Sequence, residues 1–256
     1  MTTLRIAVFS MVCALCMAAP PTFEPTSAYE LRDIEGWPVH VNRAMLTSGD
    51  PIHAAALKEL QTQLYRINRV VPKPALAELH KIGIWFEAKS TVVCACHHPS
   101  RKWLVENGFN PEKAKCIELG NPANFVNWTR HTQPWMLMHE LAHGYQQRAL
   151  GYKHPELLAA YKNAVESKIY DSVLFIGGRK KRAYALNNQM EYFAELTEAY
   201  FGRNDFYPFV RAEIKQHDPQ GYKLLRKVWE KGHARPDSKP KNKPAAERRA
   251  PEEESR

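Results

Sequence analysis

The chain has 256 residues, and its 36 Lys/Arg against 27 Asp/Glu give a formal net charge of +9 at pH 7. Roughly 200 residues lie between a Pro-rich N-terminal segment and a charged tail, enough for one sizeable core, so we expect a single domain. After the first 19 residues no segment could cross a membrane, and no recognition motif accompanies the basic charge. We therefore expect neither a membrane span nor a nucleic-acid partner.

Residues 1–19 have the pattern of a secretory signal peptide. One Arg precedes an uncharged apolar run, from position 6 to 19, that ends in small residues. The run is short for a membrane span, and Cys13 and Cys16 lack the small residue expected before a lipidated cysteine. We expect a secreted or periplasmic protein in which a Pro-rich spacer, residues 20–28, follows the signal peptide.

Export affects the interpretation of the remaining cysteines, because exported proteins fold in an oxidising setting. Cys94, Cys96 and Cys116 are an odd number, so we expect one disulfide, from Cys116 to Cys94 or to Cys96, and one free thiol. The alternative is a second metal site in the string CACHH at 94–98. Its Cys-x-Cys spacing differs from the usual Cys-x-x-Cys of zinc sites.

Residues 29–230 are predicted to form the folded domain, whose N-terminal half mixes helix and strand patterns. The segment 37–42 alternates like a strand, and 53–71 carries apolar residues at helical spacing until Pro72 ends it. A short helix at 75–81 and strands at 82–86, 91–96 and 115–119 follow. Helical patterns dominate the rest of the domain, at 155–168, 210–217 and 222–230 among other segments, so we expect the α+β class.

The central motif is His139-Glu140-Leu141-Ala142-His143, an HExxH pattern. On a helix, residues four apart lie on one face, roughly 6 Å from each other, so His139 and His143 can bind one metal ion. Glu140 then lies beside the metal and can accept a proton from a zinc-activated water as general base. The alternative is a pair of ordinary histidines at the edge of a buried helix.

The helix that carries this motif is predicted from its ends and its apolar spacing. Thr132 is a plausible N-cap, Pro134 is tolerated in the first turn, and Gly151 can end the helix. Apolar residues between them recur at three- and four-residue spacing, which indicates one flank packed on a core. A small mixed sheet before this helix and a helical lobe after it suggest a zincin-like fold.

A catalytic zinc with two histidines needs a third protein ligand and a free position for water. A metzincin would have Gly and His three and six residues after His143, where this chain has Gln146 and Ala149. The third ligand should therefore come from a separate element.

The segment 187–202, NNQMEYFAELTEAYFG, is the candidate for that element. Asn188 can cap a helix on which Glu191, Glu195 and Glu198 form one acidic stripe beside apolar side chains. One interpretation is a solvated acidic face. We favour Glu191 as the third ligand and Glu195 as acceptor of a hydrogen bond from a ligand histidine, since buried carboxylates without a cation are costly.

Tyr184 lies seven residues before Glu191, in the turn that leads into the predicted helix. Its phenol could donate a hydrogen bond to the substrate carbonyl oxygen and stabilise the oxyanion of the tetrahedral intermediate. The alternative is ordinary aromatic packing.

HExxH with a downstream helical Glu resembles the gluzincin arrangement. More narrowly, Tyr184 and the string NQMEYFAE at 188–195 are similar to the catalytic domain of the anthrax lethal factor family of metallopeptidases. The resemblance spans Pro134 to Glu198. It implies that His139, His143 and Glu191 bind zinc. It also implies that Glu140 is the base, that Tyr184 is the oxyanion donor and that Glu195 is the carboxylate behind a ligand histidine.

Residues 231–256 are predicted to form a disordered charged tail, with eight Lys/Arg against five Asp/Glu. The domain remains basic without it, which favours weak attachment to anionic surfaces. The basic run at 179–182 fits a solvated loop or a preference for acidic substrates. We predict a secreted zinc metallopeptidase acting on proteins or peptides; the alternatives are a non-catalytic zinc-binding module and a polyanion-binding module.

Overall fold

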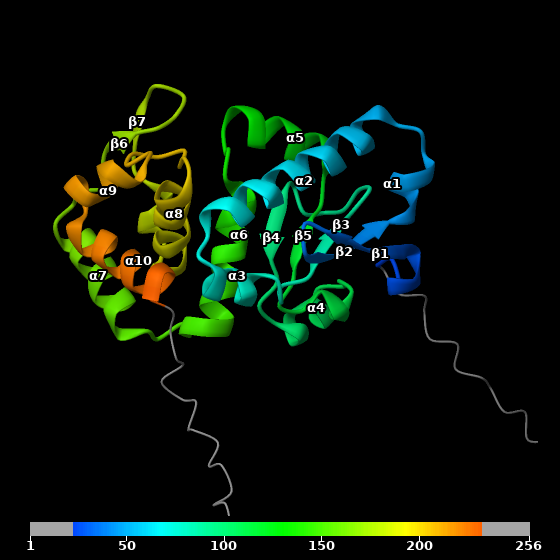
Figure 1. The fold of residues 1–256 in the computed structure, drawn as a ribbon, viewed down its shortest axis with the longest axis horizontal. Coiled ribbons are helices and arrows are strands. Elements are labelled where there is room, and N and C mark those ends of the chain that lie inside the picture. The colour runs from blue at the N-terminus through cyan, green and yellow to red at the C-terminus, as the bar shows by residue number, and fades with distance from the viewer. Residues whose placement is uncertain (1–22, 232–256) are drawn as a thin grey trace, which may run out of the picture.

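The computed structural model of the chain describes residues 23–231 and has an α+β fold. The predicted signal peptide, the first residues of the spacer and the tail from 232 lie outside the described residues. Figure 1 shows a lobe built on a sheet beside a lobe of helices. The strands of the main sheet are β1 (Tyr29–Ile34), β2 (Trp37–Asn42), β3 (Ile84–Phe86), β4 (Ala95–His97) and β5 (Ile117–Leu119). The predicted strands at 37–42, 82–86, 91–96 and 115–119 are confirmed, although the last three are shorter than expected.

The sheet is mixed, with the order β1-β2-β3-β5-β4. β2, β3 and β5 are parallel, with Val39 opposite Ile84 and Ile84 opposite Ile117. β1 and β4 are antiparallel to their neighbours and form the two edges. The edge strand β4 packs against α6, the helix that carries the HExxH motif.

Helices surround this sheet. They are α1 (Arg43–Thr47), α2 (Pro51–Val70), α3 (Lys73–Leu79), α4 (Arg101–Glu106), α5 (Pro122–His131) and α6 (Met136–Tyr145). Alternate strand residues such as Val39, Ile84 and Leu119 are buried in the main core. The opposite face holds a buried ion-pair network, in which Lys113 Nζ lies 2.7 Å from Glu87 and 3.1 Å from Glu118.

The HExxH helix begins later than predicted. Thr132 is not its N-cap, because Thr132 ends α5 and donates its N–H to Trp128 O. α6 starts at Met136, continues through a π-helical turn (Gln146–Leu150), and ends as predicted at Gly151, whose φ of 80° suits glycine. α5 was not predicted, although Asn121 caps it and Pro122 occupies its first turn.

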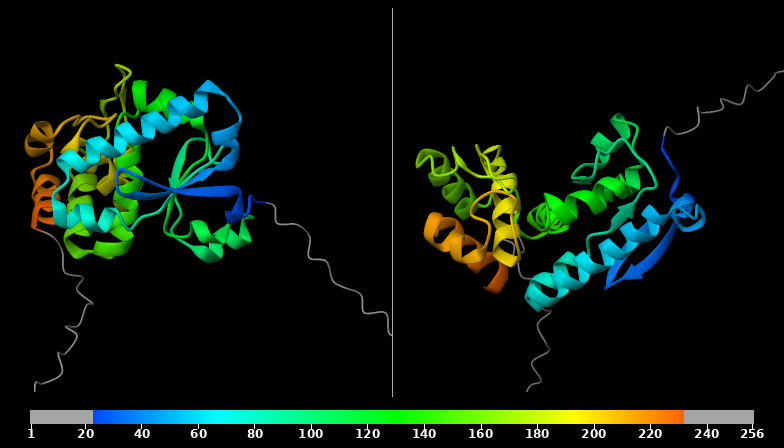
Figure 2. Two further views of the ribbon diagram at one scale, coloured as in Figure 1. Left: turned by 45° about the vertical axis from the view of Figure 1, so that its right-hand side comes forward. Right: turned by 90° about the horizontal axis from the view of Figure 1, so that it is seen from above.

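The second lobe is mainly helical, as predicted. It contains α7 (Pro155–Glu166), α8 (Gln189–Phe201), α9 (Arg211–His217), α10 (Pro219–Lys231) and a small hairpin of β6 (Val173–Leu174) and β7 (Lys180–Lys181). α8 packs against α6, and Figure 2 shows the two lobes meeting along these two helices. Gly202 at the end of α8 permits this contact, because a Cβ there would overlap the ring of Trp135 at 1.8 Å.

The predicted disulfide is wrong, because Cys94, Cys96 and Cys116 are all free. The register of the sheet explains the result: Cys96 lies opposite Glu118, so Cys116, which immediately precedes β5, is two positions away from it. The thiol of Cys94 instead lies 3.3 Å from the sulfur of Met136. Within the described part of the chain, no helix combines the length and the apolar character that crossing a membrane requires.

Candidate metal centre

His139, His143 and Glu191 meet at the contact between α6 and α8. Glu191 Oε2 lies 3.0 Å from His139 Nε2 and 3.3 Å from His143 Nε2. Each of the three residues offers a ligand atom, and these atoms all lie within 4.8 Å of one another. The three predicted ligands, 52 residues apart between His139 and Glu191, are thus brought to one point.

Local structure fixes the position of each ligand. The Asn188 side chain accepts hydrogen bonds from the N–H groups of Met190 and Glu191, so Glu191 lies in the first turn of α8, as predicted. On α6, Leu141 and Ala142 are fully buried, which leaves His139 and His143 on the flank that faces α8. Helix spacing then places both imidazoles over Glu191.

The carboxylate behind His139 is Glu198, not Glu195 as predicted. Glu198 Oε1 lies 2.8 Å from His139 Nδ1, within hydrogen-bonding distance, whereas Glu195 Oε1 is 3.9 Å from the same nitrogen. Glu195 instead accepts a hydrogen bond from Asn204 Nδ2 at 3.1 Å. A ligand histidine commonly donates its second ring N–H to a carboxylate, which orients the ring and makes it a better ligand. Glu198 fills that position.

The carboxylates and imidazoles at the site shift one another's pKa values. Burial opposes ionisation of Glu191, but its hydrogen bonds with His139 and His143 outweigh burial and lower the pKa of Glu191 to about 2. Burial favours a neutral His139, yet hydrogen bonds with Glu191 and Glu198 raise the pKa of His139 well above its usual value. The carboxylates therefore favour a positive charge at the point where the three ligands meet.

The donor set fits zinc. Two imidazole nitrogens and one carboxylate oxygen are the protein ligands of a catalytic zinc site, which keeps another position open for water. The CACHH string is different. Among the described residues, the groups able to hold a metal are His139 with His143 and Glu191, and His139 with Glu195 and Glu198; none of the residues 94–98 belongs to either.

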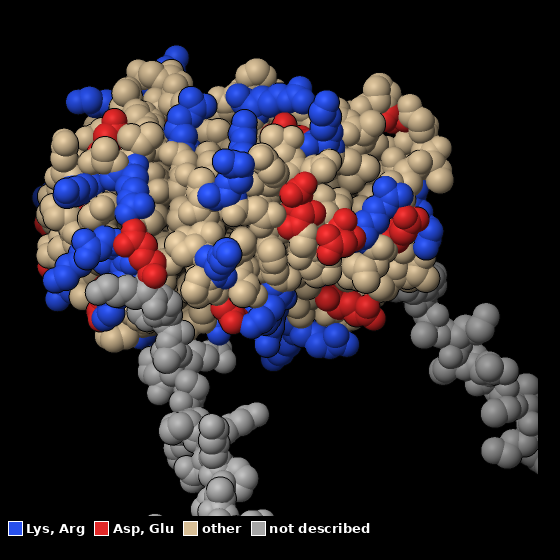
Figure 3. Space-filling model, viewed as in Figure 1, with Lys and Arg blue, Asp and Glu red and all other residues tan. Residues whose placement is uncertain are grey.

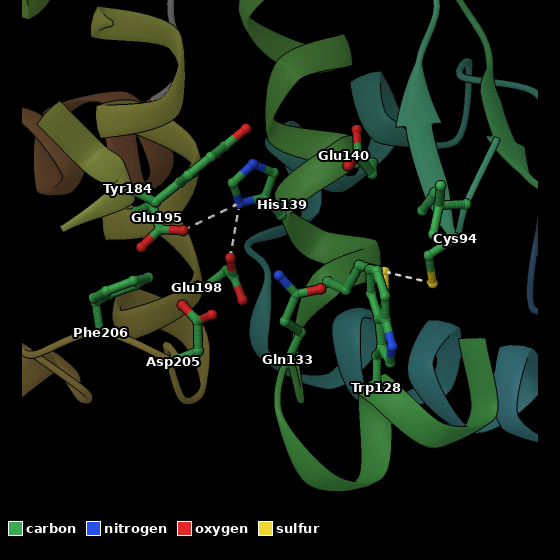
Figure 4. Close-up of a pocket in the computed structure, with 13 residues that line it drawn as sticks. Cys94, Trp128, Gln133, His139, Glu140, Tyr184, Glu195, Glu198, Asp205 and Phe206 are labelled. Carbon is green, nitrogen blue, oxygen red and sulfur yellow. Dashed lines mark hydrogen bonds and ion pairs between the residues drawn. The ribbon is translucent and has the colours of Figure 1, made fainter. Parts of the chain in front are cut away.

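A cavity of about 250 Å³ lies next to His139. Figure 4 shows its lining, to which Glu140 and Tyr184 contribute as well as His139. Residues 93–95, at the start of the edge strand β4, form part of the wall. The two predicted catalytic residues therefore border the same cavity as His139, one of the three predicted metal ligands.

Tyr184 is held by the short 3₁₀ turn Tyr184–Leu186 that precedes α8. Arg182 donates hydrogen bonds to Asn187 Oδ1 at 2.9 Å and to Leu186 O at 2.8 Å, which fastens this turn. The Tyr184 ring remains 47% exposed, and its centroid lies 6.3 Å from that of His139. A half-exposed phenol at the mouth of the cavity can reach a bound molecule, unlike the buried tyrosines of the core.

Two residues of this region were not predicted. Glu198 was recognised only as part of the acidic stripe, and its spacing from Glu191 could have identified it as a candidate for the hydrogen bond with His139. Asp205 lies in the loop after α8 and lines the cavity. No pattern around Asp205 points to the site, because its place depends on how the loop folds back over α8.

No protein-family model, no curated protein and no solved structure matches this chain.

Proposed function

We propose that the chain is a secreted zinc-dependent metallopeptidase of the gluzincin type with a zincin-like fold. The observation that carries this proposal is the meeting of His139 Nε2, His143 Nε2 and Glu191 Oε2 beside a cavity that Glu140 also lines. The resemblance of Tyr184 and residues 188–195 to the lethal factor family supports the same assignment.

Each residue of the site has a separate role in the proposed reaction. His139, His143 and Glu191 would hold zinc, which when bound acidifies a coordinated water and polarises a carbonyl group. Glu140 accepts the proton of the attacking water and passes it to the leaving amine. Tyr184 donates its phenolic O–H to the oxyanion of the substrate. With zinc bound, Glu198 would accept the Nδ1–H of His139 and leave Nε2 to the metal.

The substrate side of the proposal rests on β4. This strand pairs with β5 on one side only, it contacts α6, and residues 93–95 at its start line the cavity. An extended peptide could add to that edge through backbone hydrogen bonds, which would bring a scissile carbonyl toward Glu140 and Tyr184. A sheet edge beside the metal-binding helix also supports the zincin-like classification.

The alternatives fit less well. A non-catalytic zinc module has no use for Glu140 and Tyr184 at the cavity, and structural zinc usually has four protein ligands. A polyanion-binding module would need a concentrated basic surface. Figure 3 shows Lys and Arg scattered over both lobes on the face in view, with Asp and Glu among them.

The test is cleavage of a diverse peptide library by the chain from residue 20 onward, with added zinc, beside Glu140→Gln. We expect cuts that disappear in Glu140→Gln while its zinc content, measured by elemental analysis, stays at one ion per chain. A matched control is Glu166→Gln, which changes an exposed carboxylate at the end of α7 and should leave cleavage intact. Zinc binding without any cleavage would instead favour the non-catalytic module.

A further inference from the structure

The cavity beside the metal centre ends in three buried carboxylates. Glu195 and Glu198 come from α8 and Asp205 from the loop after it, and the three residues are 3%, 3% and 5% exposed. All three line the cavity. In Figure 4 the carboxylates of Glu198 and Asp205 lie across the cavity from Gln133 and Trp128. Burial of several negative charges together is costly unless a cation compensates them.

Two oxygen atoms of these carboxylates have no hydrogen-bond partner, although they are buried. They are Glu198 Oε2 and Asp205 Oδ1. None of the described residues that line the cavity is Lys or Arg, and His139 contacts Glu198 through Oε1, which leaves Oε2 without a partner. Buried polar atoms of a native protein are normally paired, so two unpaired acceptors on one cavity indicate that a donor arrives from outside.

One part of the remaining lining is apolar. The aromatic rings of Trp128 and Phe206 and the side chain of Met136 form its walls. The mouth is bordered by Glu140 and Tyr184, the residues that would act on the scissile bond. A long side chain that entered there would lie along apolar walls and bring its end to Glu198 and Asp205.

We propose that this acidic pocket, formed by Glu195, Glu198 and Asp205, binds the Lys or Arg side chain of a substrate next to the scissile bond. The proposal rests on the proposed peptidase function and names its substrate class. A Lys or Arg combines an apolar stem with a charged end that carries three or five N–H donors, which suits both the walls and the unpaired acceptors. The exposed basic run at 179–182 does not line the cavity and has no part in this proposal.

A second metal ion is the competing occupant, since His139, Glu195 and Glu198 also offer atoms within 4.8 Å. His139 would then have to present Nδ1 to that ion. If Nε2 holds the proposed zinc, the ring proton of neutral His139 lies on Nδ1, which is 2.8 Å from Glu198 Oε1, so Nδ1 cannot also bind a second ion. An ammonium or guanidinium group, which brings its own hydrogens, does not meet this conflict.

The first experiment is the position-resolved library cleavage, repeated with Asp205→Asn and with Asp171→Asn as matched control. Asp171 is an exposed carboxylate of the same lobe outside the cavity. We expect Lys or Arg beside the cut in the wild type and in Asp171→Asn, and a loss of this preference by about 10- to 100-fold in Asp205→Asn, as for one charge-assisted hydrogen bond. Cleavage without a basic preference, or a preference that Asp205→Asn leaves intact, would overturn the pocket and leave the hydrolase standing.

The second experiment needs no turnover. Zinc-loaded Glu140→Gln is titrated with n-butylguanidinium and with neutral n-butanol, and binding is followed by protein NMR. We expect saturable binding of the cation that is at least about tenfold tighter than that of the alcohol and that weakens in Asp205→Asn. Binding of the guanidinium, combined with a wild-type protein that cleaves nothing in the first experiment, would support the pocket and reject the peptidase. Equal binding of both probes, or two metal ions per chain, would reject the pocket.

Discussion

The assignment of Glu198 rather than Glu195 as the partner of His139 gives a quantitative prediction. Glu198→Gln replaces a carboxylate 2.8 Å from His139 Nδ1 by an amide. Glu195→Gln makes the same chemical change at 3.9 Å, without a hydrogen bond to the ring. The two variants therefore form a matched pair that makes the same chemical change with and without a hydrogen bond to His139.

The magnitude follows from the hydrogen bond. Loss of a carboxylate that orients a ligand histidine typically weakens metal binding by about 10- to 100-fold, or roughly 1.4–2.8 kcal/mol. Glu195 lies 3.9 Å from Nδ1 and makes no hydrogen bond with the ring, so we expect Glu195→Gln to weaken zinc binding by no more than about threefold. Glu198→Gln should thus bind zinc clearly more weakly than Glu195→Gln.

The assay is competition for zinc with a chromophoric chelator at pH 7.5. Far-UV circular dichroism of both metal-free variants controls for misfolding. If Glu195→Gln loses as much affinity as Glu198→Gln, or more, then the hydrogen bond with Glu198 does not orient His139 and the geometric argument is refuted.

Three further predictions concern stability. Burial, followed by the charge of Glu198, raises the pKa of Asp205 to about 7, so this group costs stability as pH rises from 3.8 through 7. Asp205→Asn should therefore raise the free energy of unfolding above pH 7 by about 2–4 kcal/mol in urea titrations; an unchanged value would contradict this cost. Burial, with nearby imidazoles, lowers the pKa of His97 to about 3, so the stability that neutral His97 provides above pH 6.5 is lost as pH falls toward 3. His97→Phe should flatten that decline in acid titrations by about 1–3 kcal/mol, and an identical slope would exclude His97 as its source. Gly202→Ala places a Cβ on the Trp135 ring and should cost about 1–3 kcal/mol in thermal unfolding, whereas no change would mean that the ring moves freely.

The sequence predicts the parts of the site that depend on local rules. HExxH puts His139 and His143 on one face of a helix, and Asn188 begins the next helix so that Glu191 lies in its first turn. The convergence of these helices does not follow from spacing alone. It was predicted from the need for a third ligand and from the family resemblance.

The choice between Glu195 and Glu198 could not be made from the sequence. Both lie on the stripe that starts at Glu191, and the selection depends on the angle at which α8 crosses α6. That angle is set by tertiary packing. One such contact is that of Gly202 with the Trp135 ring, which leaves no room for a side chain at position 202. Asp205 depends in the same way on the path of its loop.

The predicted disulfide failed for a related reason. Counting cysteines shows that one of the three must remain unpaired. It does not give the register of β4 and β5, which separates Cys116 from Cys96. The N-cap assigned to Thr132 failed because α5, a helix of ten residues, occupies the chain immediately before it. In both cases a local rule was overruled by a neighbouring element.

One carboxylate links the metal centre to the acidic pocket. Glu198 directs Oε1 at His139 and leaves Oε2 unpaired at the cavity. Its removal would weaken both zinc binding and the recognition of a basic side chain, so a Glu198 variant alone cannot separate the two roles. Asp205 has its unpaired oxygen at the cavity and is not a member of either group of potential metal ligands. Asp205→Asn therefore tests the pocket, and the pair Glu195→Gln and Glu198→Gln tests the metal centre. If Asp205→Asn loses the preference for basic side chains and keeps its full affinity for zinc, the two functions belong to separate groups.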